Sequence, residues 1–163
     1  NFSQAIAKDT QINVSLGREV TTSVWEKTTK AVSLEKFGLS AFLALRVIDH
    51  ALWIDKVIRV LRDQEMDMPD LADHHQCALG RWYYGEGIDT IKGYSQKVQD
   101  LFDAIEEPHK RVHQCGIEAV RSHQANEKDK AYEAVSCLTE ASQNIIRLFV
   151  ELMREVAEEE LSG

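Results

Sequence analysis

The sequence predicts an all-α protein, a four-helix-bundle-like domain with an additional short helix and an N-terminal helical tether. Three long segments place apolar residues at alternating steps of three and four, the spacing of a buried helix face. The sequence contains neither the alternation typical of strands nor an internal repeat. At 163 residues and 44% hydrophobic content, the chain suits one domain with a substantial core. We expect a linker or tether over residues 1–33 and a helical bundle over residues 34–163.

The N-terminal segment is rich in Ser, Thr, Gln and Lys, and its sparse apolar residues lie four apart, which is typical of a weak helix or a tether. From Leu39 the apolar pattern strengthens and predicts a long helix. Its expected core face consists of Leu39, Leu43, Val47, His50, Ile54, Val57 and Leu61. Residues 63–73 are predicted to form a loop, because Pro69 disfavours helical geometry in the residue before it.

Residues 74–93 carry Cys77 and several glycines, which predicts a short helix followed by an irregular stretch. A second long core face follows, made of Val98, Phe102, Ile105, His109, Val112, Gly116 and Ala119. Pro108 either opens a new helix there or kinks a continuous one. A last core face is predicted from Val135, Leu138, Ala141, Ile145, Leu148, Leu152 and Val156.

Composition excludes several classes of function. The formal net charge is −8 and no basic patch is present, which argues against nucleic acid or an anionic membrane as a partner. The longest apolar run, residues 41–45, is too short to cross a bilayer. Three widely spaced cysteines do not form the framework of a small secreted disulfide protein, so we expect a reducing, cytoplasmic setting.

Four residues have the types and spacing of a tetrahedral zinc site: His50, Cys77, His109 and His113. His109 and His113 are four apart, which places both rings on one helix face. Each histidine alone is also compatible with a core residue bonded to a carbonyl. Burying three without partners would be costly, and a shared metal removes that cost. The remaining histidines and cysteines favour simpler interpretations: His74, His75 and His123 as solvated surface, and Cys115 and Cys137 as small buried hydrophobic residues.

Three motifs occur in order: His50-x-x-Trp53, Cys77-x-Leu79-Gly80-x-Trp82-Tyr83 and Pro108-His109-x-x-Val112-His113. Over about residues 39–120 they resemble the chemoreceptor zinc-binding domain of bacterial signalling proteins. The resemblance implies one Zn²⁺ per chain, bound by the His of the first motif, the Cys of the second and both His of the third. It further implies a cytoplasmic, commonly dimeric, non-enzymatic sensory domain. The covalently attached output domain would be a chemotaxis receptor's signalling domain or a diguanylate cyclase.

The expected mechanism follows from the ligand set. Three imidazoles and one thiolate leave a net charge of about +1, which favours acidic partners for the histidine rings. The candidates are Asp49, Asp55, Glu106 and Glu107. The zinc-bound thiolate of Cys77 is the form that oxidants attack, and the family is linked to sensing zinc and oxidants such as hypochlorous acid. We expect Cys77 to convert either input into helix movement. Phe42 and Phe149 are candidate exposed apolar residues for a homodimer contact.

Three alternatives remain at this stage. A metal-dependent hydrolase needs an open coordination position and a general base such as Glu107 or Asp49, but the His-Glu-x-x-His motif is absent. A di-iron bundle uses several inward carboxylates, including Glu-x-x-His pairs; Glu106 and His109 have that spacing, but a second such pair is missing. The third alternative is a structural bundle without a metal.

Overall fold

The computed structural model describes residues 34–62 and 71–162, with side chains from Gly38 onward. Its elements are α2 (Leu34–Arg62), α3 (Ala78–Trp82), the π-helix η1 (Tyr83–Gly87), α4 (Ile88–Ile91), α5 (Gln96–Gln124) and α6 (Lys128–Ser162). The described ranges contain helices that pack together and no strand, which confirms the all-α bundle. The predicted tether and residues 63–70 of the predicted loop lie outside the described residues.

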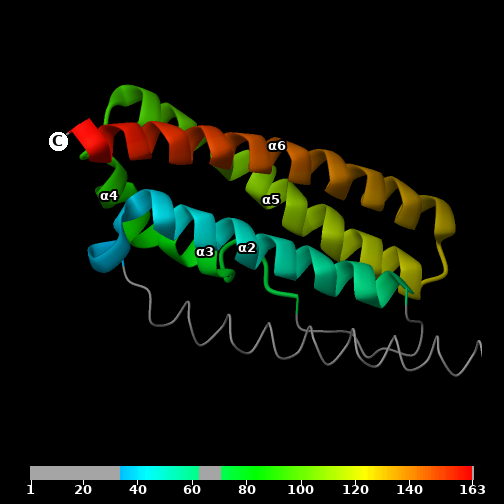
Figure 1. Cartoon of the computed structure of the whole chain (residues 1–163). Helices are drawn as coiled ribbons and strands as arrows, with labels where there is room; N and C mark the ends of the chain where they lie inside the picture. The colour runs from blue at the N-terminus through cyan, green and yellow to red at the C-terminus, as the bar shows by residue number, and fades with distance from the viewer. Residues whose placement is uncertain (1–33, 63–70, 163) are drawn as a thin grey trace, which may run out of the picture. The chain divides into compact units, whose positions relative to one another are not determined.

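Helices α5 and α6 form an antiparallel hairpin, side by side along their lengths (Figure 1). The turn between them uses Asn126 at a φ of 59°, a left-handed conformation that asparagine tolerates. All seven residues of the predicted α5 core face are buried. Pro108 lies inside the helix, so the continuous alternative is the correct one. The loss of one backbone donor at Pro108 does not end α5, and residues on both sides of the proline, such as Ile105 and Val112, are buried.

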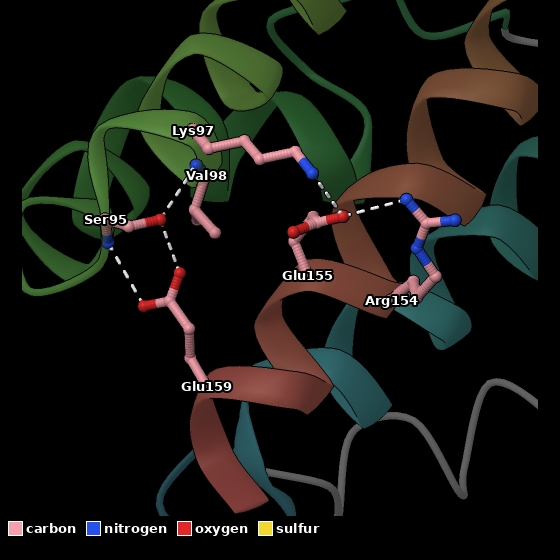
Figure 2. A network of polar contacts seen from close by, with 6 residues as sticks. All are labelled: Ser95, Lys97, Val98, Arg154, Glu155 and Glu159. Carbon is pink, nitrogen blue, oxygen red and sulfur yellow. Dashed lines mark hydrogen bonds and ion pairs between the residues drawn. The ribbon is translucent and has the colours of Figure 1, made fainter. Parts of the chain in front are cut away.

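The start of α5 is fixed to the end of α6 by side chains (Figure 2). Ser95 caps α5, since its Oγ accepts the N–H of Val98 at 3.4 Å. The Ser95 N–H donates to Glu159 Oε2 at 3.1 Å, and Lys97 Nζ lies 2.7 Å from Glu155 Oε1. These contacts close the open end of the hairpin.

The buried face of α2 differs from the predicted one by a rotation of about one residue. Leu39, Leu43, His50 and Val57 are buried as predicted, whereas Val47, Ile54 and Leu61 are only half-buried. Arg46, Trp53 and Val60 take their places. A contact between helices explains the rotation: the Trp53 ring lies against Gly116 of α5.

Gly38 interrupts α2 with a φ of 76° and a ψ of 164°, and the helix resumes after it. Glycine adopts this backbone without strain. The first N–H after the break, that of Leu39, donates to Glu160 Oε1 at 2.7 Å, and Ser40 Oγ donates to Glu160 Oε2 at 3.1 Å. A carboxylate from α6 therefore satisfies the helix start, where negative charge is favourable.

Two predictions about α6 are wrong. Val135 and Leu148 do not belong to the buried face, which uses Ala134 and Phe149 instead. Phe149 is 1% exposed, so it is not an exposed candidate for dimer contact. Phe42 is half-buried, because its ring packs against Trp82 at 5.1 Å between centroids.

The prediction for Cys115 and Cys137 also needs correction. The two residues form a disulfide between α5 and α6, with 5.9 Å between their Cα atoms. The antiparallel register of the hairpin places them opposite each other, and residue spacing alone does not give that register. Among the described helices, none combines the length and apolar content that a membrane span requires.

Candidate metal centre

Three buried histidine rings meet between α2 and α5. The ring centroids of His50, His109 and His113 lie 5.2, 5.3 and 5.0 Å apart, which is close to an equilateral triangle. Each ring offers a nitrogen within 4.8 Å of the nitrogens offered by the others. The three rings, called the ligand histidines below, come from the two helices on which the sequence predicted them.

Cys77 lies beside this group and comes from a third element. Its Sγ lies 3.2 Å from Nε2 of His109, and it is the free cysteine of the described chain. Two ligands of a tetrahedral zinc ion lie roughly 3.3 to 3.6 Å apart, given bond lengths of about 2.0–2.1 Å to nitrogen and 2.3 Å to sulfur. The structure thus brings the three histidines together and places the sulfur of the fourth predicted residue, Cys77, beside one of them, His109.

The position of Cys77 depends on Gly80. Cys77 is the N-cap of α3, and its Sγ accepts the N–H of Gly80 at 3.2 Å. The backbone of the preceding loop crosses Gly80 so closely that an added Cβ would lie 1.7 Å from the carbonyl oxygen of His74. The same carbonyl accepts the Cys77 thiol at 3.7 Å. The Cys-x-Leu-Gly motif therefore forms a compact turn that holds the Cys77 sulfur beside His109.

Trp53 connects the same loop to both long helices. Its Nε1 donates to the carbonyl of Ala72 at 3.1 Å, and its ring packs against His113 at 4.3 Å between centroids. The ring fits only because residue 116 is glycine, where an added Cβ would lie 2.6 Å from the tryptophan ring. This geometry explains the tryptophan of the His-x-x-Trp motif.

The carbonyl of Ala72 also fixes His113. Nδ1 of His113 lies 2.8 Å from this oxygen, so Nδ1 carries the proton and Nε2 keeps its lone pair. No sequence signal marked Ala72, because the contact uses only its backbone. The ring N–H of His113 thus donates to a backbone carbonyl rather than to one of the predicted carboxylates.

Three of those four carboxylates make other contacts. Asp49 pairs with Arg46 at 3.0 Å and Asp55 with Arg59 at 3.2 Å. Glu106 accepts the Tyr84 hydroxyl at 3.3 Å. The fourth, at position 107, is exposed. Arg46, which the sequence analysis missed, is a buried cation; burial lowers its pKa, and the neighbouring Asp49 carboxylate opposes that shift.

Burial keeps the three rings neutral. It lowers the pKa of His50 to about 3, assisted by repulsion from His113, and lowers the pKa of His109 to about 2, assisted by the neighbouring histidines. Burial also lowers the pKa of His113 to about 4, while the hydrogen bond to Ala72 opposes that shift. A neutral ring is the form that binds metal.

Burial also acts on the thiol. It raises the pKa of Cys77, against the opposing influence of the Gly80 N–H and the Arg81 charge. Without a metal, the thiol is therefore protonated at neutral pH, and a metal ligand must lose that proton.

The group fits a zinc ion by a further criterion. Nε2 of His50, Nε2 of His113 and Nδ1 of His109 are buried without a hydrogen-bond partner among the described residues. Each buried polar atom without a hydrogen bond lowers the free energy of unfolding by about 1–3 kcal/mol. A metal bound by all three rings would give two or three of these nitrogens a partner at once, whereas without a metal they stay unbonded.

A second group with metal-ligand chemistry lies nearby, formed by Asp73, His74 and His75. Asp73 Oδ1 already accepts two backbone N–H groups, from His75 at 2.8 Å and Gln76 at 2.9 Å. His75 is exposed as predicted, whereas His74 is half-buried. His123, the third histidine predicted at the surface, is half-buried near the end of α5.

Comparison with known proteins gives one match. Residues 50–120 match the family model described as the chemoreceptor zinc-binding domain, and this range contains all four predicted ligands. No curated protein and no solved structure matches the chain. The match confirms the resemblance, and with the histidine group it confirms Zn²⁺ as the cofactor.

Proposed function

From the chemoreceptor zinc-binding domain at residues 50–120, we propose that this chain is the sensory zinc module of a bacterial signalling protein and binds one Zn²⁺ per chain. The ligands in this proposal are His50, Cys77, His109 and His113. One observation carries it: three buried histidine rings offer nitrogens within 4.8 Å of one another, and the Cys77 sulfur lies 3.2 Å from Nε2 of His109.

The ligand set favours regulation over catalysis. Bound zinc would hold the Cys77 thiol deprotonated and join α2, α5 and the start of α3. Four protein ligands fill a tetrahedral shell, whereas a catalytic zinc needs an open position for water. The carboxylates weighed as general bases also have other environments, since Asp49 pairs with Arg46 and position 107 is exposed. We therefore propose a non-enzymatic role.

The chain's own residues make Cys77 a suitable trigger. The loop before it is fixed at two points, by Trp53 through the Ala72 carbonyl and by Gly80 through close packing. In the proposed step, hypochlorous acid transfers oxygen to the thiolate, giving a sulfenic acid and chloride. The weaker sulfur donor would release this loop from the histidines, and Trp53 would pass the displacement to α2. Zinc occupancy is the second proposed input.

The signalling context is proposed from the family. We place the module in the cytoplasm, attached to a chemotaxis receptor's signalling domain, with a diguanylate cyclase as the alternative. A homodimer is supported by apolar exposure on α6, where Ile146 is 48% exposed and Val150, one turn later, is 57% exposed. The predicted residue Phe149 lies between them but faces the core.

The test measures zinc release on oxidation. Zinc-loaded protein is treated with equimolar hypochlorous acid beside a chromophoric chelator, and Cys77→Ser is compared with the control His75→Ala. We expect rapid release from wild type and from the control. Cys77→Ser should bind zinc more weakly and lose the oxidant-dependent release. Full zinc affinity and an unchanged oxidant response in Cys77→Ser would refute the mechanism, and zinc-dependent hydrolytic turnover would favour the hydrolase alternative.

A further inference from the structure

The disulfide between Cys115 and Cys137 joins the two long helices of the hairpin at a place that the metal centre does not use. The cysteines are 22 residues apart in sequence, one in α5 and one in α6. Their Cα separation of 5.9 Å lies in the range of ordinary disulfides. The pair can therefore exchange between dithiol and disulfide without a large backbone movement.

The two sulfurs differ in access. An open hollow of about 600 Å³ is lined by both cysteines and by the charged residues Glu118, Lys130 and Glu133. Cys115 is 9% exposed and counts among the core residues, whereas Cys137 is half-buried. A small oxidant thus reaches Cys137 first, and Cys115 is placed behind it as the second thiol.

The pair is separated from the zinc ligands by helix geometry. Cys115 follows His113 by two residues, which is about 200° around α5. His113 contacts Trp53 of α2, whereas Cys115 is bonded to α6. No residue of α6 belongs to the described metal group. Oxidation of this pair therefore leaves every proposed zinc ligand chemically unchanged.

We propose that Cys115 and Cys137 form a reversible redox site that cross-links α5 to α6 in response to two-electron oxidants such as hydrogen peroxide. The Cys137 thiolate attacks the peroxide, the O–O bond breaks, and a sulfenic acid and water form. The Cys115 thiolate then attacks the Cys137 sulfur, forms the S–S bond and expels the oxygen as a second water. Two thiols are oxidised and one peroxide is reduced. A dithiol reductant reverses the step by thiol–disulfide exchange.

The test counts thiols on folded, full-length protein as purified, with its metal content measured in parallel. The protein is reduced, freed of reductant, treated with hydrogen peroxide, alkylated under denaturing conditions and digested for mass spectrometry. We expect a single linked peptide pair containing Cys115 and Cys137, formed without loss of bound metal and reversed by dithiothreitol. A Cys77→Ala variant should form the same link.

Two single variants test whether Cys137 reacts with peroxide first and Cys115 second. In Cys115→Ser, Cys137 keeps the oxygen and is trapped by a sulfenic acid reagent, whereas in Cys137→Ser the buried Cys115 reacts at least about tenfold more slowly. Separate alkylation of both cysteines after peroxide would overturn the proposal. A link that requires Cys77, or one that dithiothreitol cannot reduce in folded protein, would also overturn it.

Discussion

Substituting Gly80 with alanine tests whether the turn at Gly80 sets the position of the Cys77 sulfur. The added Cβ would lie 1.7 Å from the His74 carbonyl oxygen, and 2.8 Å from the carbonyl carbon. Ordinary contact needs about 3.3 Å or more, so the loop and α3 must separate by roughly 1.5 Å. Zinc ligands tolerate only about ±0.2 Å. Sulfur is therefore expected to leave the coordination shell or bind in a strained geometry.

The expected cost is a ten- to hundredfold loss of zinc affinity, or about 1.4–2.8 kcal/mol. Alanine's higher helix propensity adds about 1 kcal/mol of stability to α3, which does not restore the sulfur position. Gly93→Ala is the matched control, since its Cβ would make only an ordinary 3.6 Å contact with Thr90.

The assay for Gly80→Ala is a zinc titration against a chromophoric chelator, repeated with cobalt(II), whose thiolate charge-transfer absorption reports sulfur ligation. The control should retain both the affinity and the absorption. If Gly80→Ala also retains both, the reasoning that places Cys77 through this turn is refuted.

Three further predictions concern the surroundings of the centre. Trp53→Phe removes the hydrogen bond to Ala72, worth about 1 kcal/mol, and should lower zinc affinity by up to about tenfold in the same chelator titration; unchanged affinity would contradict it. In metal-free protein the ligand histidines have pKa values lowered to about 4 or below, whereas unfolded histidine has about 6.5. The unfolded chain then binds more protons, so the free energy of unfolding should fall as the pH decreases from about 6.5 towards 4, by roughly 2 kcal/mol per histidine at pH 5. Urea unfolding at pH 7.5 and pH 5 measures this, and equal stability would argue against neutral buried rings. The Cys115→Ser/Cys137→Ser double variant should lose about 3 kcal/mol in urea unfolding without reductant and show little difference with reductant, given the 22-residue separation.

The α5 core was predicted correctly because its apolar residues repeat without ambiguity. Every position from Val98 to Ala119 in that stripe is buried, including His109. In α2, apolar residues occupy adjacent positions such as Trp53 and Ile54, so the spacing alone did not decide between two faces about 100° apart. The contact between the tryptophan and Gly116 decided it, and that contact joins residues from different helices.

In the candidate site too, contacts between different segments of the chain could not be predicted from the sequence. The residue types of the four proposed ligands and their motifs were visible in the sequence, and the structure brings the three histidines together with the Cys77 sulfur beside His109. The acceptor for His113 was not visible, because it is the backbone oxygen of Ala72. The link between Cys115 and Cys137 depends on the register of α5 against α6, which only the folded hairpin establishes.

The most direct test of the zinc centre is metal content by elemental analysis of tag-free, reduced protein. We predict one zinc per chain in wild type and in the control His75→Ala, and reduced or absent zinc in Cys77→Ala and His113→Ala. Wild-type protein that contains no zinc and takes up none when zinc is added would contradict the proposed centre.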